Sequence, residues 1–130
     1  MNGVTIPISR RVIGCAFSVS NTLGAGFLES VYANALCIEL ADQGIRFERE
    51  APLDVYYKDR LVGRFVADLV VDGCLLVELK ALRLLNTEHE AQVMNYLRAT
   101  GLSVGLLLNF GTPKLEIRRL VWRHDDADRV

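Results

Sequence analysis

The sequence predicts an α/β fold in which helices flank a mixed β-sheet. Apolar residues recur at helical spacing in the first third of the chain, and strand-like segments rich in Val, Leu and aromatic residues follow. The chain then returns to one helix and two more strands. With 130 residues, of which 51% are hydrophobic, it has the length of one domain and enough apolar side chains for a sizeable core.

Two helices are expected before the sheet. The first runs from Ile8 to Leu23, because its apolar residues fall along one face, and Gly24 and Gly26 end it. The second runs from Phe27 to about Gln43, and Gly44 is placed to stop it. The buried stripe predicted for this second helix consists of Leu28, Val31, Ala35 and Ile38.

Three strands should follow as an antiparallel meander, over residues 47–57, 61–71 and 75–81. Turn-forming residues separate them, namely Lys58-Asp59-Arg60 and Asp72-Gly73. The middle of the chain is therefore expected to form consecutive neighbouring strands.

One more helix and two strands complete the predicted order α-α-β-β-β-α-β-β. Thr87, followed three residues later by Glu90, is a capping-box pattern that predicts a helix over residues 88–100. Residues 104–110 form an apolar run typical of a central strand, and residues 115–122 alternate like a peripheral one. We expect a single domain over residues 1–123 and a charged tail without a packing signal over 124–130.

Charge and cysteine content narrow the setting. The formal net charge of -1 lacks the basic excess common in nucleic-acid-binding proteins. Cys15, Cys37 and Cys74 are far apart in apolar surroundings, which indicates reduced thiols and not a disulfide framework or a metal site. No uncharged apolar run approaches about 18 residues, and no signal peptide is recognisable, so a cytoplasmic protein without membrane contact is expected.

The most informative residues are charges within otherwise apolar strands. Asp68 lies in the second predicted strand, and Glu78 and Lys80 share one face of the third because side chains alternate along a strand. A two-residue turn at Asp72-Gly73 would put Asp68 and Glu78 on opposite faces. A three-residue connection, Asp72-Gly73-Cys74, would place them directly opposite, with Cβ atoms about 5 Å apart, and we predict this second register.

Two carboxylates at that distance favour a bound cation. They repel by about 1 kcal/mol in water and by about 4 kcal/mol at an intermediate dielectric. Ligation by oxygen suits Mg²⁺ or Mn²⁺. The alternative is that Glu78 and Lys80 form an ordinary surface ion pair, since Glu-x-Lys is common in strands.

Residues of two helices can join these charges. Glu29 opens the second helix, where the helix dipole alone would also favour an acidic residue. Gln92 and Tyr96 are four residues apart on the later helix, with His89 one turn before, while Ala91, Met94 and Leu97 can face the core. Gly24-x-Gly26 is not a dinucleotide loop, because no third glycine follows and no strand precedes it.

Together these residues resemble the GxxExxY protein family, whose motif stands here as Gly26, Glu29 and Tyr32. That family belongs to the PD-(D/E)XK nuclease superfamily. The likeness covers nearly the whole chain, and its Gln-x-x-x-Tyr element is similar to RecB-type and phage-exonuclease-type members. The matching residues, in order, are Glu29, Asp68, Glu78, Lys80, Gln92 and Tyr96.

The resemblance implies a restriction-endonuclease-like αβββαβ core and a metal-dependent nuclease. Asp68, Glu78 and the backbone carbonyl of Leu79 would hold Mg²⁺ or Mn²⁺, and Glu29 would complete or tune the site. Lys80 would orient the attacking water. Gln92 and Tyr96 would form a supporting shell. Phosphate contacts would come from arginines, with Arg10, Arg11, Arg83, Arg98, Arg118 and Arg119 as candidates.

The implied substrate is DNA more than RNA, with ends or single strands as candidate targets. The competing hypothesis is a non-catalytic nucleic-acid-binding or regulatory module that retains the nuclease fold. Surplus apolar surface would also allow a homodimer or a partner protein.

Overall fold

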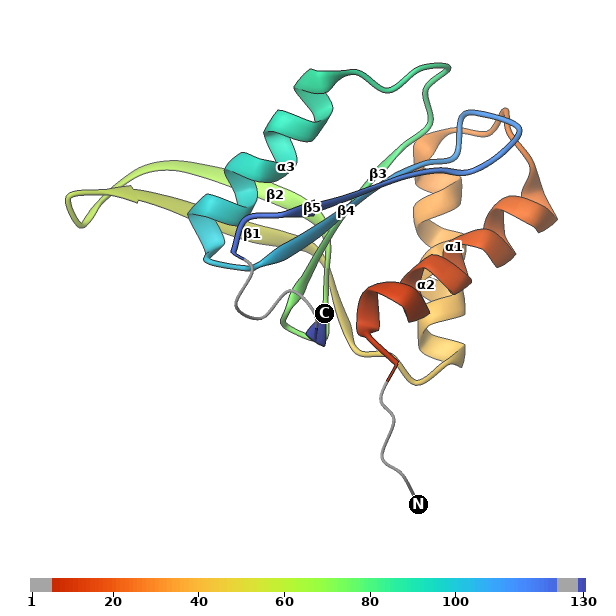
Figure 1. Cartoon of the computed structure of the whole chain (residues 1–130), viewed down its shortest axis with the longest axis horizontal. Coiled ribbons are helices and arrows are strands. Elements are labelled where there is room, and N and C mark those ends of the chain that lie inside the picture. Colours follow the sequence, from red (N-terminus) through yellow and green to blue (C-terminus); the bar gives the residue numbers. More distant parts are fainter. Residues whose placement is uncertain (1–5, 124–128) are drawn as a thin grey trace.

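The computed structural model describes residues 6–123 and 129–130, which form three layers with a five-stranded sheet in the middle (Figure 1). The α/β fold and the predicted order of elements are confirmed. The elements are α1 (Ile8–Leu23), α2 (Glu29–Asp42), β1 (Phe47–Tyr57), β2 (Arg60–Val71), β3 (Leu75–Lys80), α3 (Thr87–Thr100), β4 (Val104–Asn109) and β5 (Glu116–Val121).

The sheet is mixed, with strand order β1-β2-β3-β4-β5. Strands β3 and β4 pair in parallel, and every other neighbouring pair is antiparallel. The parallel pair follows from the crossover through α3, which connects β3 to β4. Every residue of β4 is buried, as the apolar run had predicted.

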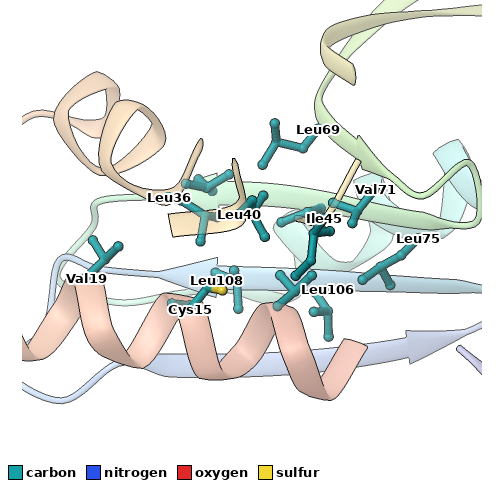
Figure 2. Packing of buried hydrophobic residues seen from close by; sticks show 14 of the residues in the cluster. Cys15, Val19, Leu36, Leu40, Ile45, Leu69, Val71, Leu75, Leu106 and Leu108 are labelled. Atoms are coloured by element: carbon teal, nitrogen blue, oxygen red, sulfur yellow. The ribbon is translucent and has the colours of Figure 1, made fainter. Parts of the chain in front are cut away.

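Helices α1 and α2 cover one face of the sheet. Figure 2 shows their side chains packed against those of β2, β3 and β4. Full burial of a Leu or Val side chain contributes about 1.5–3 kcal/mol, so this layer supplies much of the stability. Labelled members of this core are Cys15, Val19, Leu36, Leu40, Ile45, Leu69, Val71, Leu75, Leu106 and Leu108.

The buried face of α2 differs from the predicted one. The helix buries Tyr32, Leu36 and Leu40, whereas Leu28, at its N-cap, and Ile38 are 77% and 63% exposed. Because α2 carries apolar residues around its whole circumference, their spacing does not select one face. Contact with the sheet and α1 selects the face on which Tyr32 lies.

Helix α3 covers the opposite face and begins one residue earlier than predicted. Its N-cap is Asn86, whose Oδ1 accepts from the backbone N–H groups of Glu88 (2.9 Å) and His89 (3.3 Å). His89 Nδ1 in turn accepts from the Asn86 N–H at 3.2 Å. The capping box is therefore Asn86–His89, not Thr87–Glu90.

Close packing of α3 on the sheet depends on Gly105 of β4. A Cβ at this position would lie 2.7 Å from Cγ1 of Val93. Val93, Tyr96 and Leu97 form the buried side of α3, whereas Ala91, expected to face the core, is exposed.

The ribbon formed by β1 and β2 turns at Glu50 and Asp68. Glu50 has a left-handed backbone (φ 53°), and the register of its neighbours places it across from Asp68. Leu69 packs in the α1–α2 core but Ala67, two residues away, packs in the α3 core. Residues two apart normally share a face, so the strand twists here and carries the ribbon toward α3. Figure 1 shows the ribbon extending beyond the other strands.

Residues 124–128 of the predicted tail lie outside the described residues. Val130, also assigned to that tail, is buried in the α1–α2 core, and the backbone N–H of Ser9 donates to its carbonyl at 2.6 Å. It packs because it is an apolar side chain next to the start of α1. Within residues 6–123 and 129–130, no helix combines the length and apolar character that crossing a membrane requires. Cys15, Cys37 and Cys74 are free thiols.

Candidate active site

Strands β2 and β3 are paired as far as Leu69 and Val77 and separate at Asp68 and Glu78, forming a fork. Their paired residues are Val71↔Leu75, Val70↔Leu76 and Leu69↔Val77, and the pairing stops there. The connection is the three-residue one, Asp72-Gly73-Cys74, as predicted. Continued by one step, this register places Asp68 across from Glu78.

Beyond the last strand pair, the Asp68 carboxylate replaces a backbone carbonyl of β2 as the hydrogen-bond acceptor for β3. Its Oδ2 accepts from the backbone N–H of Leu79 at 2.7 Å. The carbonyl of the next residue, Lys80, accepts from the N–H of Phe110 at 2.8 Å and so faces β4. Because backbone groups of successive strand residues point to opposite sides, the carbonyl of Leu79 faces the fork.

Glu78 is an acid buried against a second acid. Glu78 is only 5% exposed, and the pKa of its carboxyl is raised to about 9, with burial as the largest cause. Hydrogen bonding to the Asp68 side chain and the charge of Asp68 add to this rise, whereas the Asp68 backbone and the charge of Lys80 oppose it. At neutral pH the Glu78 carboxyl is therefore protonated when no cation is bound beside it.

Glu29 approaches the fork from the first turn of α2. Burial raises the pKa of its carboxyl, the charge of Asp68 raises it further, and the charge of Lys80 lowers it. The structure thus brings Glu29, Asp68, Glu78 and Lys80 within electrostatic reach of one another, although they come from three different elements.

Tyr32 holds the loop that leads to Glu29. Its hydroxyl donates to the carbonyl of Gly24 at 2.6 Å and accepts from the N–H of Phe27 at 3.1 Å. Its buried ring stacks on Phe110, with centroids 4.9 Å apart and planes 12° apart. The backbone N–H of Phe110 donates to the carbonyl of Lys80. Through its contact with Phe110, Tyr32 therefore connects the start of α2 to the end of β3.

Helix α3 adds Gln92 and Tyr96 to the same region. Gln92 Nε2 donates to the Tyr96 hydroxyl at 3.1 Å. The pKa of Tyr96 is raised by burial and by the charges of Glu78 and Asp68, and Tyr96 packs in the same cluster as Ala67, which precedes Asp68 in the chain. His89, predicted on the same face, is instead occupied in the helix cap.

Asn109 is a supporting residue that sequence reasoning missed. It is fully buried at the end of β4, where its side chain bonds Leu82 twice: Oδ1 accepts from the N–H and Nδ2 donates to the carbonyl, each at 2.9 Å. Nδ2 also donates to Glu116 at 2.8 Å, and Oδ1 accepts from the N–H of Gly111 at 3.1 Å. Asn109 therefore fixes the chain just beyond Lys80. In the sequence, Asn109 stands out as the one polar side chain in the apolar run of residues 104–110.

Gly111 allows the backbone that follows β4 to lie directly against the backbone of Leu82. A Cβ at this position would overlap the backbone nitrogen and oxygen of Leu82. The strand end of β4 and the chain after Lys80 consequently lie too close for any side chain at position 111.

The donor set at the fork fits a hard divalent cation. No group of three His, Cys, Asp or Glu side chains within the described part of the chain is arranged to hold a metal. The fork offers two carboxylates and the carbonyl oxygen of Leu79, and water would complete the coordination. Mg²⁺ is commonly held by one or two carboxylates with several waters. The raised pKa of the Glu78 carboxyl indicates that a positive charge beside it would be favourable.

The sheet is mixed, helices cover both of its faces, and the acidic fork lies between two antiparallel neighbours. A family model described as the PD-(D/E)XK nuclease superfamily matches residues 7–120. The chain belongs to this superfamily.

One solved structure, described as the crystal structure of SSO0001, is similar in fold. It has a TM-score of 0.59 and 18% sequence identity, and the match covers 77% of this chain and 52% of that one. The chain thus spans about half the length of that protein, and the likeness concerns the fold alone. A search of curated proteins gave no match.

Proposed function

We propose that this chain is a metal-dependent nuclease of the GxxExxY group that hydrolyses phosphodiester bonds in DNA. The observation that carries the proposal is the fork, where the adjacent carboxylates of Asp68 and Glu78 meet the Leu79 carbonyl beside Lys80. Superfamily membership supports nucleic acid as the substrate. The nuclease domain would comprise residues 1–123, and free cysteines are compatible with the cytoplasm.

Asp68, Glu78 and the Leu79 carbonyl would hold Mg²⁺ or Mn²⁺, with Glu29 acting directly or through water. The bound ion would activate a water and neutralise charge on the scissile phosphate. Because metal ligation requires ionised carboxylates, Glu78 would release its proton when the ion binds.

Lys80 has the position to act on the attacking water. It shares a face with Glu78, two residues before it, and the two side chains interact electrostatically. Its ammonium group would orient the water and stabilise the charge that develops on the phosphate oxygens. Gln92 and Tyr96, hydrogen-bonded to each other at the edge of α3, would orient Lys80 or a phosphate oxygen.

The test is cleavage of labelled single- and double-stranded DNA and RNA with Mg²⁺ or Mn²⁺. Lys80→Ala should lower the rate by about 10²–10³-fold, the effect of removing one group that stabilises transition-state charge. Lys58→Ala, in the exposed β1–β2 turn, is the matched control and should cleave like the wild type. Equal cleavage by wild type and Lys80→Ala, or no product from any substrate, would contradict the nuclease assignment.

One observation favours a second function, a non-catalytic binding or regulatory module. The net charge of -1 means that the chain has no excess of cations over anions for holding a nucleic-acid backbone. Binding of labelled DNA without cleavage under any of these metal conditions would identify this function.

A further inference from the structure

A groove of about 740 Å³ lies between the β1–β2 ribbon and α3, next to the candidate active site. Its size falls within the range of ligand-binding pockets, about 300–1,000 Å³. The ribbon contributes Val55, Tyr56 and Phe65, and α3 contributes Gln92, Tyr96 and Arg98 among others.

Three aromatic residues line this groove, namely Tyr56, Phe65 and Tyr96. Phe65 and Tyr56 are 46% and 61% exposed, although both are large apolar side chains. The ring of Phe65 lies 5.6 Å from that of Tyr96 and is tilted by 45° to it. Exposed aromatic faces of this kind mark binding surfaces, because a flat partner can cover them.

The groove adjoins the fork through Tyr96. Gln92 and Tyr96 line the groove, and Tyr96 packs in one cluster with Ala67, which precedes Asp68, and Leu76, two residues before Glu78. A ligand lying on Phe65 and Tyr96 would therefore lie beside the two acids. This position points to the substrate of the fork as the occupant, in preference to an unrelated partner.

The charges of the groove favour single-stranded over double-stranded nucleic acid. Among the residues that line it, Arg98 is the one cation and Glu88 the one anion. A double helix is held mainly by Lys and Arg contacts to phosphates, which this surface does not offer in number. Unpaired bases instead stack on aromatic side chains, and every base has a face that can do so.

We propose that the groove between the β1–β2 ribbon and α3 binds unpaired bases of single-stranded DNA beside the phosphate positioned at the fork. This inference deepens the proposed function and rests on it for the identity of the substrate. It gives the near-neutral chain a means of holding DNA that needs few cations.

The test is a binding measurement in EDTA, where hydrolysis cannot occur. Fluorescence anisotropy would compare a short labelled oligothymidylate, an abasic strand of equal length and a duplex. The wild type should bind the oligothymidylate on the order of tenfold or more tightly than the abasic strand. Phe65→Ala should weaken oligothymidylate binding by about five- to a hundredfold and leave the abasic strand unchanged.

Two further variants keep this test independent of folding. Tyr56→Ala should act in the same direction as Phe65→Ala, and Phe65→Trp should retain binding. Tyr57→Ala is the matched control, since this residue is 65% exposed on the same ribbon but does not line the groove. Circular dichroism would confirm that each variant has the wild-type fold.

Outcomes for the groove and for the nuclease are distinguishable. Base-dependent binding without cleavage of any substrate would support the proposed role of the groove and contradict the proposed catalysis. Equal binding of thymidylate and abasic strands would overturn the groove even if DNA were cleaved. A concentration-dependent dimer that Phe65→Ala dissociates would also overturn it, by showing that a second copy covers this surface.

Discussion

The Asp68 carboxylate accepts a hydrogen bond from the backbone N–H of Leu79 at 2.7 Å, at the point where strands β2 and β3 separate. One interaction thereby satisfies the first unpaired strand group of the fork and fixes an acidic oxygen beside Glu78. The Asp68 side chain thus has a structural role, as acceptor for the Leu79 N–H, and an electrostatic role, as a charge beside Glu78. Substitutions at position 68 can separate these two roles.

Two substitutions at Asp68 should differ in stability although both remove its charge. Asp68→Asn retains an oxygen acceptor for the Leu79 N–H, whereas Asp68→Ala leaves this donor without it. We expect Asp68→Ala to have a free energy of unfolding about 1–3 kcal/mol lower than Asp68→Asn, the cost of an unsatisfied buried donor. Urea denaturation measures the difference, and equal stabilities would show that the hydrogen bond has no structural role.

The stability of the metal-free protein should fall as the pH rises. The pKa of Glu78 is raised from its ordinary 4.5 to about 9, so the folded state binds more protons than the unfolded state between these values. Its contribution is fully present below about pH 4.5 and is lost as the pH rises through 9, with a slope of at most about 1.4 kcal/mol per pH unit.

Urea denaturation from pH 5 to 9 in EDTA would measure this slope. Glu78→Gln should flatten it, because the amide does not ionise, and should be the more stable protein at pH 9. Glu48→Gln, an exposed residue of β1, should leave the slope unchanged. A wild type as stable at pH 9 as at pH 5 would contradict the burial of an ionisable pair.

Asn109→Ala should be strongly destabilising. It removes both bonds to Leu82 and those to Glu116 and Gly111, in a fully buried position. We expect a loss of at least about 2 kcal/mol in the free energy of unfolding, since each unsatisfied buried group costs about 1–3 kcal/mol. Asn95→Ala, on the exposed side of α3, should change it by less than about 0.5 kcal/mol. Similar losses in both variants would refute the role of Asn109.

Substitution of Glu50 by glycine should relieve the strain of its left-handed backbone. A non-glycine residue with φ near 53° costs about 1–2 kcal/mol, which Glu50→Gly relieves. Glu48→Gly carries the same loss of side chain without that relief. The free energy of unfolding of Glu50→Gly should therefore exceed that of Glu48→Gly by about 1–2 kcal/mol. Thermal denaturation would compare the two, and a less stable Glu50→Gly would mean that the ribbon needs this side chain.

Much of the fold could be predicted from periodicity and turn residues. The order of elements follows from the change between helical and strand spacing, and the Asp68–Glu78 register from a three-residue connection. The buried face of α2 could not be predicted, because Leu28 and Ile38 are as apolar as the residues that are buried. Only the packing against the sheet distinguishes them.

Candidate site residues can be recognised in the sequence where they interrupt apolar strands, as Asp68, Glu78 and Lys80 do. Asn109 interrupts one too, but its function depends on the backbone of Leu82, which is distant in sequence. The aromatic groove depends on the twist at Glu50 that carries the ribbon toward α3, and local sequence spacing does not show such a tertiary twist.

The most direct test of the central claim is a calorimetric titration of the protein with Mn²⁺ at neutral pH. We predict saturable binding at one site, with a proton released, that Glu78→Gln and Asp68→Asn abolish and Glu48→Gln preserves. No binding to the wild type, or binding that the two fork substitutions leave intact, would contradict a metal site at Asp68 and Glu78.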